Sequence, residues 1–197
     1  MNDCLVNKQF APSEQINATP DEKLDWLVKK VYGIDSLRES QRTAIKTYLS
    51  GKHTFLIMPT GSGKSLSFWA SAALYSGLTV VFEPLIALIQ DQMVSIDLTI
   101  HHLSHFDILM VFKLQTQLIA NGIPCGCIYA SITQGKSVQE RVLREVALGL
   151  TRILFTTPEK LQKNIQFRNF LHKVQKERGI QFAIDEAHCV LDYVHFR

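Results

Sequence analysis

Short runs of apolar residues that do not alternate with polar ones recur along this sequence, and segments with helix signals separate them. The runs are HTFLIM (53–58), LTVVFE (78–83), CGCIYA (125–130), RILFTT (152–157) and IQFAID (180–185). Strands that are apolar on both faces are typical of a parallel sheet, because helices cover both of its sides. The sequence therefore predicts an α/β fold with a doubly wound parallel sheet.

The clearest helix signal is TPDEKLDWLVKKVYG, residues 19–33. Thr19 is suited to the N-cap and Glu22 completes a capping box, while Pro20 fits the first helical position and Gly33 the end. Further helices are predicted over 39–50, 64–76, 137–149 and 158–178, and another beginning near residue 85.

Composition limits the domain count and the class of protein. With 197 residues, 46% of them hydrophobic, we expect one domain over 19–197, preceded by a disordered tail over 1–18 that lacks periodicity. A net charge of +3 is too small to indicate a nucleic-acid binder by itself. No secretory signal and no run of about 18 apolar residues is found, and the four cysteines form no CxxC pair. We therefore expect a soluble intracellular protein with no membrane partner.

The stretch FLIMPTGSGKSLSF (55–68) predicts a phosphate-binding loop between a strand and a helix. Its glycines let backbone N–H groups turn toward phosphate oxygens, and the helix N-terminus adds the positive end of its dipole. Lys64 can reach the β- and γ-phosphates, and the Ser65 hydroxyl can ligate Mg²⁺. The strict pattern has glycine at position 58, where this chain has Met58. An ordinary strand–turn–helix is the alternative.

A second candidate feature is FAIDEAHC (182–189), where an apolar strand ends in two adjacent carboxylates. A nucleotide hydrolase needs one carboxylate to hold Mg²⁺, a role that suits Asp185, and another to activate water, which suits Glu186. The carboxyl end of a parallel strand is where α/β sheets bind ligands. Together with the glycine loop, the pair predicts an ATP or GTP site.

Four motifs then fall in the order found in superfamily 2 helicases: TGSGKS (60–65), PLIALIQDQ (84–92), TTPEKL (156–161) and DEAHC (185–189). The chain most resembles the RecQ branch, because YGIDSLRESQ (32–41) is similar to that branch's adenine-recognition motif. The resemblance implies a single RecA-like lobe of the P-loop NTPase type, which is the ATP-binding lobe of a 3′–5′ DNA helicase. The "LRESQ" motif favours this interpretation over the lobe of an RNA helicase.

The resemblance also implies roles for individual residues, with ATP and Mg²⁺ as cofactors. Catalysis is assigned to Lys64, Asp185 and Glu186, and Mg²⁺ binding to Ser65 and Asp185. ATP binding is assigned to Arg38, Gln41, Thr60, Gly61, Ser62, Gly63, Lys64 and Ser65. Coupling to DNA is assigned to His188 and Tyr193, and nucleic-acid contact to Pro84, Thr157 and Pro158. No structural metal is expected.

Three features depart from the RecQ pattern. Tyr193 stands where a tryptophan is usual, and Ile34 where an aromatic residue commonly helps to stack the base. The sequence ends at Arg197, before the second RecA-like lobe that supplies an arginine finger. We therefore expect single-stranded or forked DNA as the partner, in the nucleus, and no unwinding without a second lobe or partner chain. The alternative is a non-catalytic ATP- and nucleic-acid-binding module that acts through a partner.

The stretch DQMVSIDLTIHHLSHFDILMVFKLQTQ (91–117) interrupts the family pattern. Asp97, His101 and His105 follow each other at four-residue steps, so a helix would place them on one face, as a metal site requires. An inserted surface helix is another possibility. A third is that residues 94–115 are a non-native insert, translated from a retained intron, because removing them restores an amphipathic helix in frame.

Sequencing the transcript tests the retained-intron hypothesis. We expect the segment that encodes 94–115 to begin with GT, to end with AG, and to be spliced out of most messages. A coding segment without those splice signals would contradict the hypothesis and return the histidines to consideration as ligands.

Overall fold

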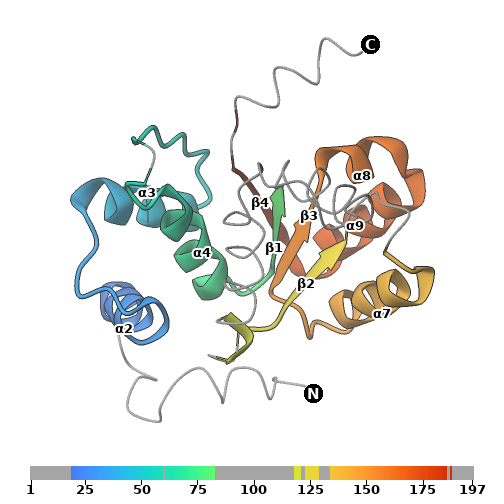
Figure 1. Ribbon diagram of the computed structural model, residues 1–197, viewed down its shortest axis with the longest axis horizontal. Helices are drawn as coiled ribbons and strands as arrows, with labels where there is room; N and C mark the ends of the chain where they lie inside the picture. The colour runs from blue at the N-terminus through green and yellow to red at the C-terminus, as the bar shows by residue number, and fades with distance from the viewer. Residues whose placement is uncertain are drawn as a thin grey trace, which may run out of the picture. The chain divides into compact units, whose positions relative to one another are not determined.

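The computed structural model describes residues 19–59, 61–82, 118–120, 123–128, 134–185 and 187. Within these ranges the chain forms two compact units (Figure 1). The first contains the residues up to 76 together with 118–120 and 123, and the second contains 77–82 and the residues from 124 onward. The tail over 1–18 and the segment 94–115 lie outside the described residues, and one domain over 19–197 stays a prediction.

The complete helices described in the first unit are α2 (Pro20–Tyr32), α3 (Glu39–Leu49) and α4 (Lys64–Leu74), and residues 118–120 are helical as well. The predicted capping box of α2 is confirmed. The Glu22 N–H donates to Thr19 Oγ1 at 3.3 Å, and the Thr19 N–H donates to Glu22 Oε2 at 2.7 Å. Gly33 then ends the helix in the left-handed conformation, with φ 66°.

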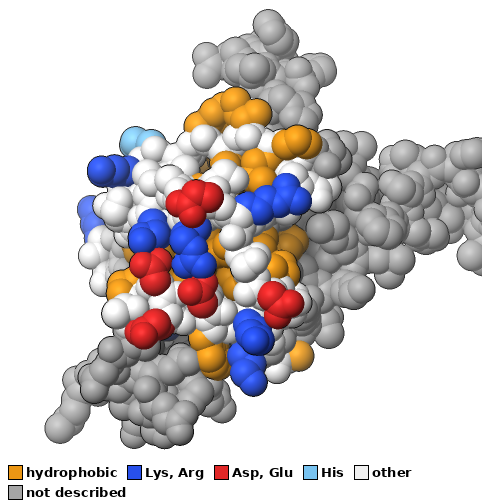
Figure 2. All heavy atoms as spheres, turned by 90° about the vertical axis from the view of Figure 1, so that its left-hand side faces the viewer, with side chains coloured by type: hydrophobic (Ala, Val, Ile, Leu, Met, Phe, Trp, Pro, Cys, Tyr) orange, Lys and Arg blue, Asp and Glu red, His pale blue; other side chains and the backbone are white. Residues whose placement is uncertain are grey.

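Helices α2, α3 and α4 pack through their apolar faces, and ion pairs join α2 to α3. The buried residues include Leu24, Leu27, Val28 and Val31 of α2, Ala44 and Ile45 of α3, and Leu66, Ala70 and Ala72 of α4. Lys46 Nζ lies 2.9 Å from Asp21 Oδ2, and Arg42 pairs with both Asp21 and Asp25. The hydrogen bond from Lys46 is the main cause that lowers the pKa of Asp21. Figure 2 shows acidic and basic side chains mixed on the side of the molecule that faces the viewer, so the charges compensate one another locally.

The second unit is built on a sheet of four parallel strands, as predicted. The strands are β1 (Leu78–Phe82), β2 (Cys125–Ile128), β3 (Ile153–Thr156) and β4 (Ile180–Ile184), in the spatial order β2-β3-β1-β4. In the register of the sheet, Val80 of β1 lies between Leu154 of β3 and Phe182 of β4. The α/β class with a parallel sheet is therefore confirmed.

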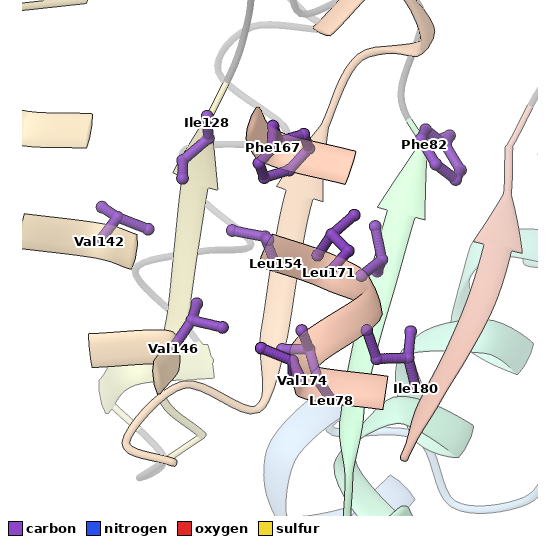
Figure 3. Close-up of a cluster of buried hydrophobic side chains, with 11 residues drawn as sticks. Leu78, Phe82, Ile128, Val142, Val146, Leu154, Phe167, Leu171, Val174 and Ile180 are labelled. Carbon is purple, nitrogen blue, oxygen red and sulfur yellow. The ribbon is translucent and has the colours of Figure 1, made fainter. Parts of the chain in front are cut away.

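Helices α7 (Lys136–Ala147) and α9 (Ile165–Arg178) cover one face of this sheet, and α8 (Pro158–Lys163) precedes α9. Figure 3 shows Val142 and Val146 of α7 directed toward β2, and Phe167, Leu171 and Val174 of α9 beside β3 and β1. A Cβ atom at Gly126 of β2 would lie 2.8 Å from Val142 Cγ1. The glycine therefore allows α7 to pack close to the sheet.

Side chains on the opposite face of the sheet are buried as well. Val81 of β1 and Ile153 of β3 are fully buried, and Phe155 is 1% exposed. The apolar runs of β1 and β3 therefore correspond to strands that are buried on both sides, which is the arrangement that the absence of alternation indicates, whereas Phe182 and Ile184 of β4 are 48% and 49% exposed.

Two predicted elements differ from the structure. Residues 53–58 form no strand, and Phe55 and Ile57 are each 80% exposed. An apolar run favours burial but does not supply the neighbouring strand whose hydrogen bonds make it a strand. The helix predicted over 158–178 is divided at Asn164, whose Oδ1 accepts the Phe167 N–H at 2.9 Å and caps α9. Asparagine favours this N-cap position over a helix interior.

Among the described helices, none has the length and apolar character that crossing a membrane requires. The helix predicted to begin near residue 85 lies outside the described residues.

Candidate functional site

The glycine-rich loop of the first unit has the backbone that the sequence predicts. Gly61 and Gly63 have φ angles of 76° and 84°, in the left-handed region that favours glycine. The helix α4 begins immediately after them, at Lys64. A Cβ atom at Gly61 would meet no atom within 4 Å, so only the φ angle requires glycine there.

The N-terminus of α4 is suited to an anion. Its N-cap is Gly63, which has no side chain, and its first turn contains no acidic residue. The first N–H groups of a helix have no intrahelical partner, and the dipole places partial positive charge there. Lys64, the first helical residue, adds a full positive charge at the same end.

Backbone carbonyls at the start of the loop accept hydrogen bonds from residues at its end. Lys64 Nζ donates to the Met58 carbonyl at 3.2 Å, and the Ser62 N–H donates to the Pro59 carbonyl at 3.2 Å. The Ser62 hydroxyl donates to the same Pro59 carbonyl. Because the acceptor at position 58 is a backbone group, methionine in place of the strict pattern's glycine still provides it.

Gln41 connects the first turn of α3 to this loop. Its side chain is 4% exposed, and its Oε1 accepts the Arg38 N–H at 2.9 Å. Its Nε2 donates to the Gly63 carbonyl at 3.0 Å and to the Ser62 carbonyl at 3.4 Å. Arg38, the N-cap of α3, is exposed. Gln41 therefore contacts the predicted phosphate loop directly, and Arg38 is connected to it through Gln41.

The remaining residues assigned to the nucleotide divide between the two units. Ser65 lies half-buried in the first turn of α4. Asp185 follows β4 in the second unit, where its N–H donates to the Phe82 carbonyl at 3.1 Å and continues the β1–β4 ladder. The structure places Asp185 at the carboxyl end of a parallel strand, as predicted. Thr60, Glu186, His188, Tyr193 and Pro84 lie outside the described residues.

The segment assigned to nucleic-acid contact forms the start of α8. Pro158 occupies the first helical turn, and Thr157 is its N-cap, fully buried, with its Oγ1 accepting the Lys160 N–H at 3.4 Å. Lys160 Nζ donates to Gln139 Oε1 at 2.6 Å, and partial burial lowers its pKa. The Thr157 hydroxyl is thus already used within the protein, and its contact with nucleic acid stays a prediction.

The described residues contain no group of three His, Cys, Asp or Glu side chains that could hold a metal ion. The triplet Asp97, His101 and His105 lies outside them.

Sequence reasoning missed the link between Gln41 and the loop, and it missed the carbonyls of Met58 and Pro59 as partners. The sequence contains no pattern that indicates either set of hydrogen bonds. Every residue except proline has the same backbone donor and acceptor, and residues 41 and 63 meet only because α3 packs on α4.

Comparison with known families identifies the family to which the chain belongs. The sequence pattern of the DEAD/DEAH box helicase family matches residues 38–197. The chain belongs to this family. The matched range contains the glycine loop, Thr157 and Asp185, so the family assignment and the site geometry concern the same residues.

Within the DEAD/DEAH box helicases, similar proteins are RecQ helicases. ATP-dependent DNA helicase Q-like 5 of Arabidopsis thaliana is 33% identical over 175 residues, covering 89% of this chain and 16% of the relative. ATP-dependent DNA helicase RecQ of Pasteurella multocida is 32% identical over 165 residues, covering 84% and 22%. RecQ-like DNA helicase blm-1 of Caenorhabditis elegans is 30% identical over 184 residues, covering 91% and 16%. The resemblance to the RecQ branch is confirmed, and the chain spans less than a quarter of each of these relatives.

The two loop glycines of this DEAD/DEAH box lobe provide a matched pair for mutation. Gly61→Ala and Gly63→Ala should each cost about 1–2 kcal/mol, because alanine is strained at positive φ. Gly63→Ala should cost about 1 kcal/mol more, since its Cβ would lie 2.8 Å from Gln41 Nε2 and displace the hydrogen-bonded amide. Denaturant unfolding measures both. Equal unfolding free energies for the two variants would contradict the contact with Gln41.

Proposed function

We propose that the chain is the ATP-binding lobe of a RecQ-type, ATP-dependent 3′–5′ DNA helicase. One observation carries the proposal. Gly61 and Gly63 adopt left-handed conformations directly before an uncapped helix whose first residue is Lys64. This backbone would offer N–H groups, and Lys64 a cation, to an anion at the helix start, which is what a nucleotide triphosphate requires.

The residue types assigned to the nucleotide are those that MgATP requires. Residues 60–65 would hold the phosphates, with Lys64 at the β- and γ-phosphates, and Ser65 and Asp185 would ligate Mg²⁺. The ion, when bound, would neutralise charge on the phosphate oxygens. Glu186, next to the strand end that holds Asp185, would orient the attacking water.

Adenine recognition is assigned to Gln41 and Arg38. A carboxamide reads an adenine edge with one donor and one acceptor, and a guanidinium can lie over the face of the base. The Ser62 carbonyl is the more distant of the two acceptors of Gln41 Nε2, at 3.4 Å against 3.0 Å for Gly63. It is therefore the partner that Nε2 would give up first in favour of a base.

For the nucleic acid we propose single-stranded or forked DNA, bound through Pro84, Thr157 and Pro158 by sequence-independent contacts. Support comes from the relatives, whose names describe DNA helicases. His188 and Tyr193 would couple DNA binding to the nucleotide. A second RecA-like lobe, in the same protein or in a partner chain, would complete the motor. The nucleus stays a prediction.

Binding of MgATP tests the phosphate loop. Lys64→Ala should weaken binding of a fluorescent ATP analogue at least about tenfold, because a charge-assisted bond to phosphate is lost. Lys23→Ala removes an exposed lysine of α2 and is the matched control, since it changes the net charge equally. Indistinguishable affinities for the wild type and Lys64→Ala would refute the assignment.

ATP turnover separates the helicase lobe from a non-catalytic binding module. The 197-residue chain alone should hydrolyse ATP close to the background rate, with or without single-stranded DNA, because an arginine finger contributes several orders of magnitude. Adding a second RecA-like lobe from a RecQ helicase should raise the rate, and Glu186→Gln should abolish the increase. No increase with any added lobe would favour the binding module.

A further inference from the structure

Gln41 is placed to do more than read a base. Its carboxamide nitrogen has two N–H donors and lies within hydrogen-bonding distance of two consecutive carbonyls of the phosphate loop, those of Ser62 and Gly63. Gln41 is 4% exposed, and its bond to the Ser62 carbonyl is buried while that to the Gly63 carbonyl is part-buried, so water competes little for the amide.

Fixing a carbonyl also fixes an N–H group. A peptide unit is planar and trans, so its C=O and its N–H point in opposite directions. The peptide that contains the Gly63 carbonyl also contains the Lys64 N–H, and the peptide of the Ser62 carbonyl contains the Gly63 N–H. Holding both carbonyls toward α3 therefore turns these two N–H groups away from it.

The other end of the Gln41 side chain is held as well. Its Oε1 accepts the Arg38 N–H at 2.9 Å, which caps the first turn of α3. Arg38 cannot return this bond because a guanidinium has no acceptor, so Gln41 alone provides the side-chain part of the cap. The absence of a side chain at Gly63 completes the fit, since a Cβ there would lie 2.8 Å from Gln41 Nε2.

We propose that Gln41 is a positioning residue for the triphosphate: it orients the Gly63 and Lys64 N–H groups of the loop, independently of any contact with adenine. The inference rests on the proposed function of the loop. It adds that the strength of phosphate binding depends on a residue in a different helix, which the adenine motif contributes.

A ligand that has phosphates and no base tests this role. Binding of magnesium tripolyphosphate and of MgATP is measured by competition with the fluorescent ATP analogue. The variants are Gln41→Ala, which removes both ends of the link, and Gln41→Glu, which keeps the acceptor for the Arg38 N–H and loses both donors. Gln41→Ala should bind tripolyphosphate about three- to tenfold more weakly, the size expected from a neutral hydrogen bond. Gln41→Glu should bind it more weakly still, because its carboxylate also repels the phosphates.

Glu22→Ala is the matched control, because Glu22 occupies the same capping position in α2 and its carboxylate accepts hydrogen bonds from Thr19. It should bind both ligands like the wild type. Circular dichroism confirms that each variant is folded. Without ligand, the ¹⁵N–¹H signals of Gly63 and Lys64 should shift in both Gln41 variants and stay unchanged in Glu22→Ala.

The outcomes separate the two proposals. Gln41 variants that bind MgATP weakly but tripolyphosphate normally would restrict Gln41 to the base and overturn the inference, as would unchanged Gly63 and Lys64 signals. Tripolyphosphate binding that Lys64→Ala leaves unaffected, or no binding by the wild type, would overturn the proposed phosphate loop itself.

Discussion

The candidate site depends on Gly63, because two independent structural requirements apply at this position. The backbone must adopt φ 84° for the loop to turn into α4, and the Gln41 amide occupies the space that a side chain would fill. The first requirement is local and concerns the loop alone. The second is tertiary, since it exists only when α3 lies against α4. Together they make the shape of the phosphate loop a property of the packed helices and not of the loop residues alone.

Most hydrogen bonds around the loop have one pattern: side chains donate to its carbonyls, and among its N–H groups that of Ser62 donates to the Pro59 carbonyl. Gln41, Lys64 and the Ser62 hydroxyl all donate to backbone oxygens of residues 58–63. Buried carbonyls need such partners, since an unpaired one would cost free energy. The consequence is electrostatic. With the Ser62 and Gly63 carbonyls paired, the N–H groups of the first turn of α4 and the positive end of its dipole favour an anion.

The second unit is organised by its sheet in a different way. The buried face of the sheet needs close-packed cover, and Gly126 lets α7 approach β2 within contact distance of Val142. The same sheet brings Asp185 to the carboxyl end of β4, where its N–H extends the ladder to Phe82. The position of this carboxylate is therefore set by strand pairing, whereas that of Lys64 is set by a helix start. The residues assigned to the nucleotide are therefore positioned in two ways, Asp185 by the pairing of strands and Lys64 by the start of a helix.

Much of this molecule could be predicted from local signals in the sequence. Thr19, Glu22 and Gly33 determined the ends of α2, because capping bonds and left-handed glycines act within a few residues. The apolar runs of β1 and β3 indicated burial on both faces, and the glycine-loop and DEAH motifs indicated the family. Tertiary structure decided the rest. Residues 53–58 have the composition of a strand but no pairing, since pairing needs a neighbour that composition does not specify. Gln41 meets Gly63 and Thr157 is buried because helices and strands distant in the chain pack together, and no local pattern carries that information.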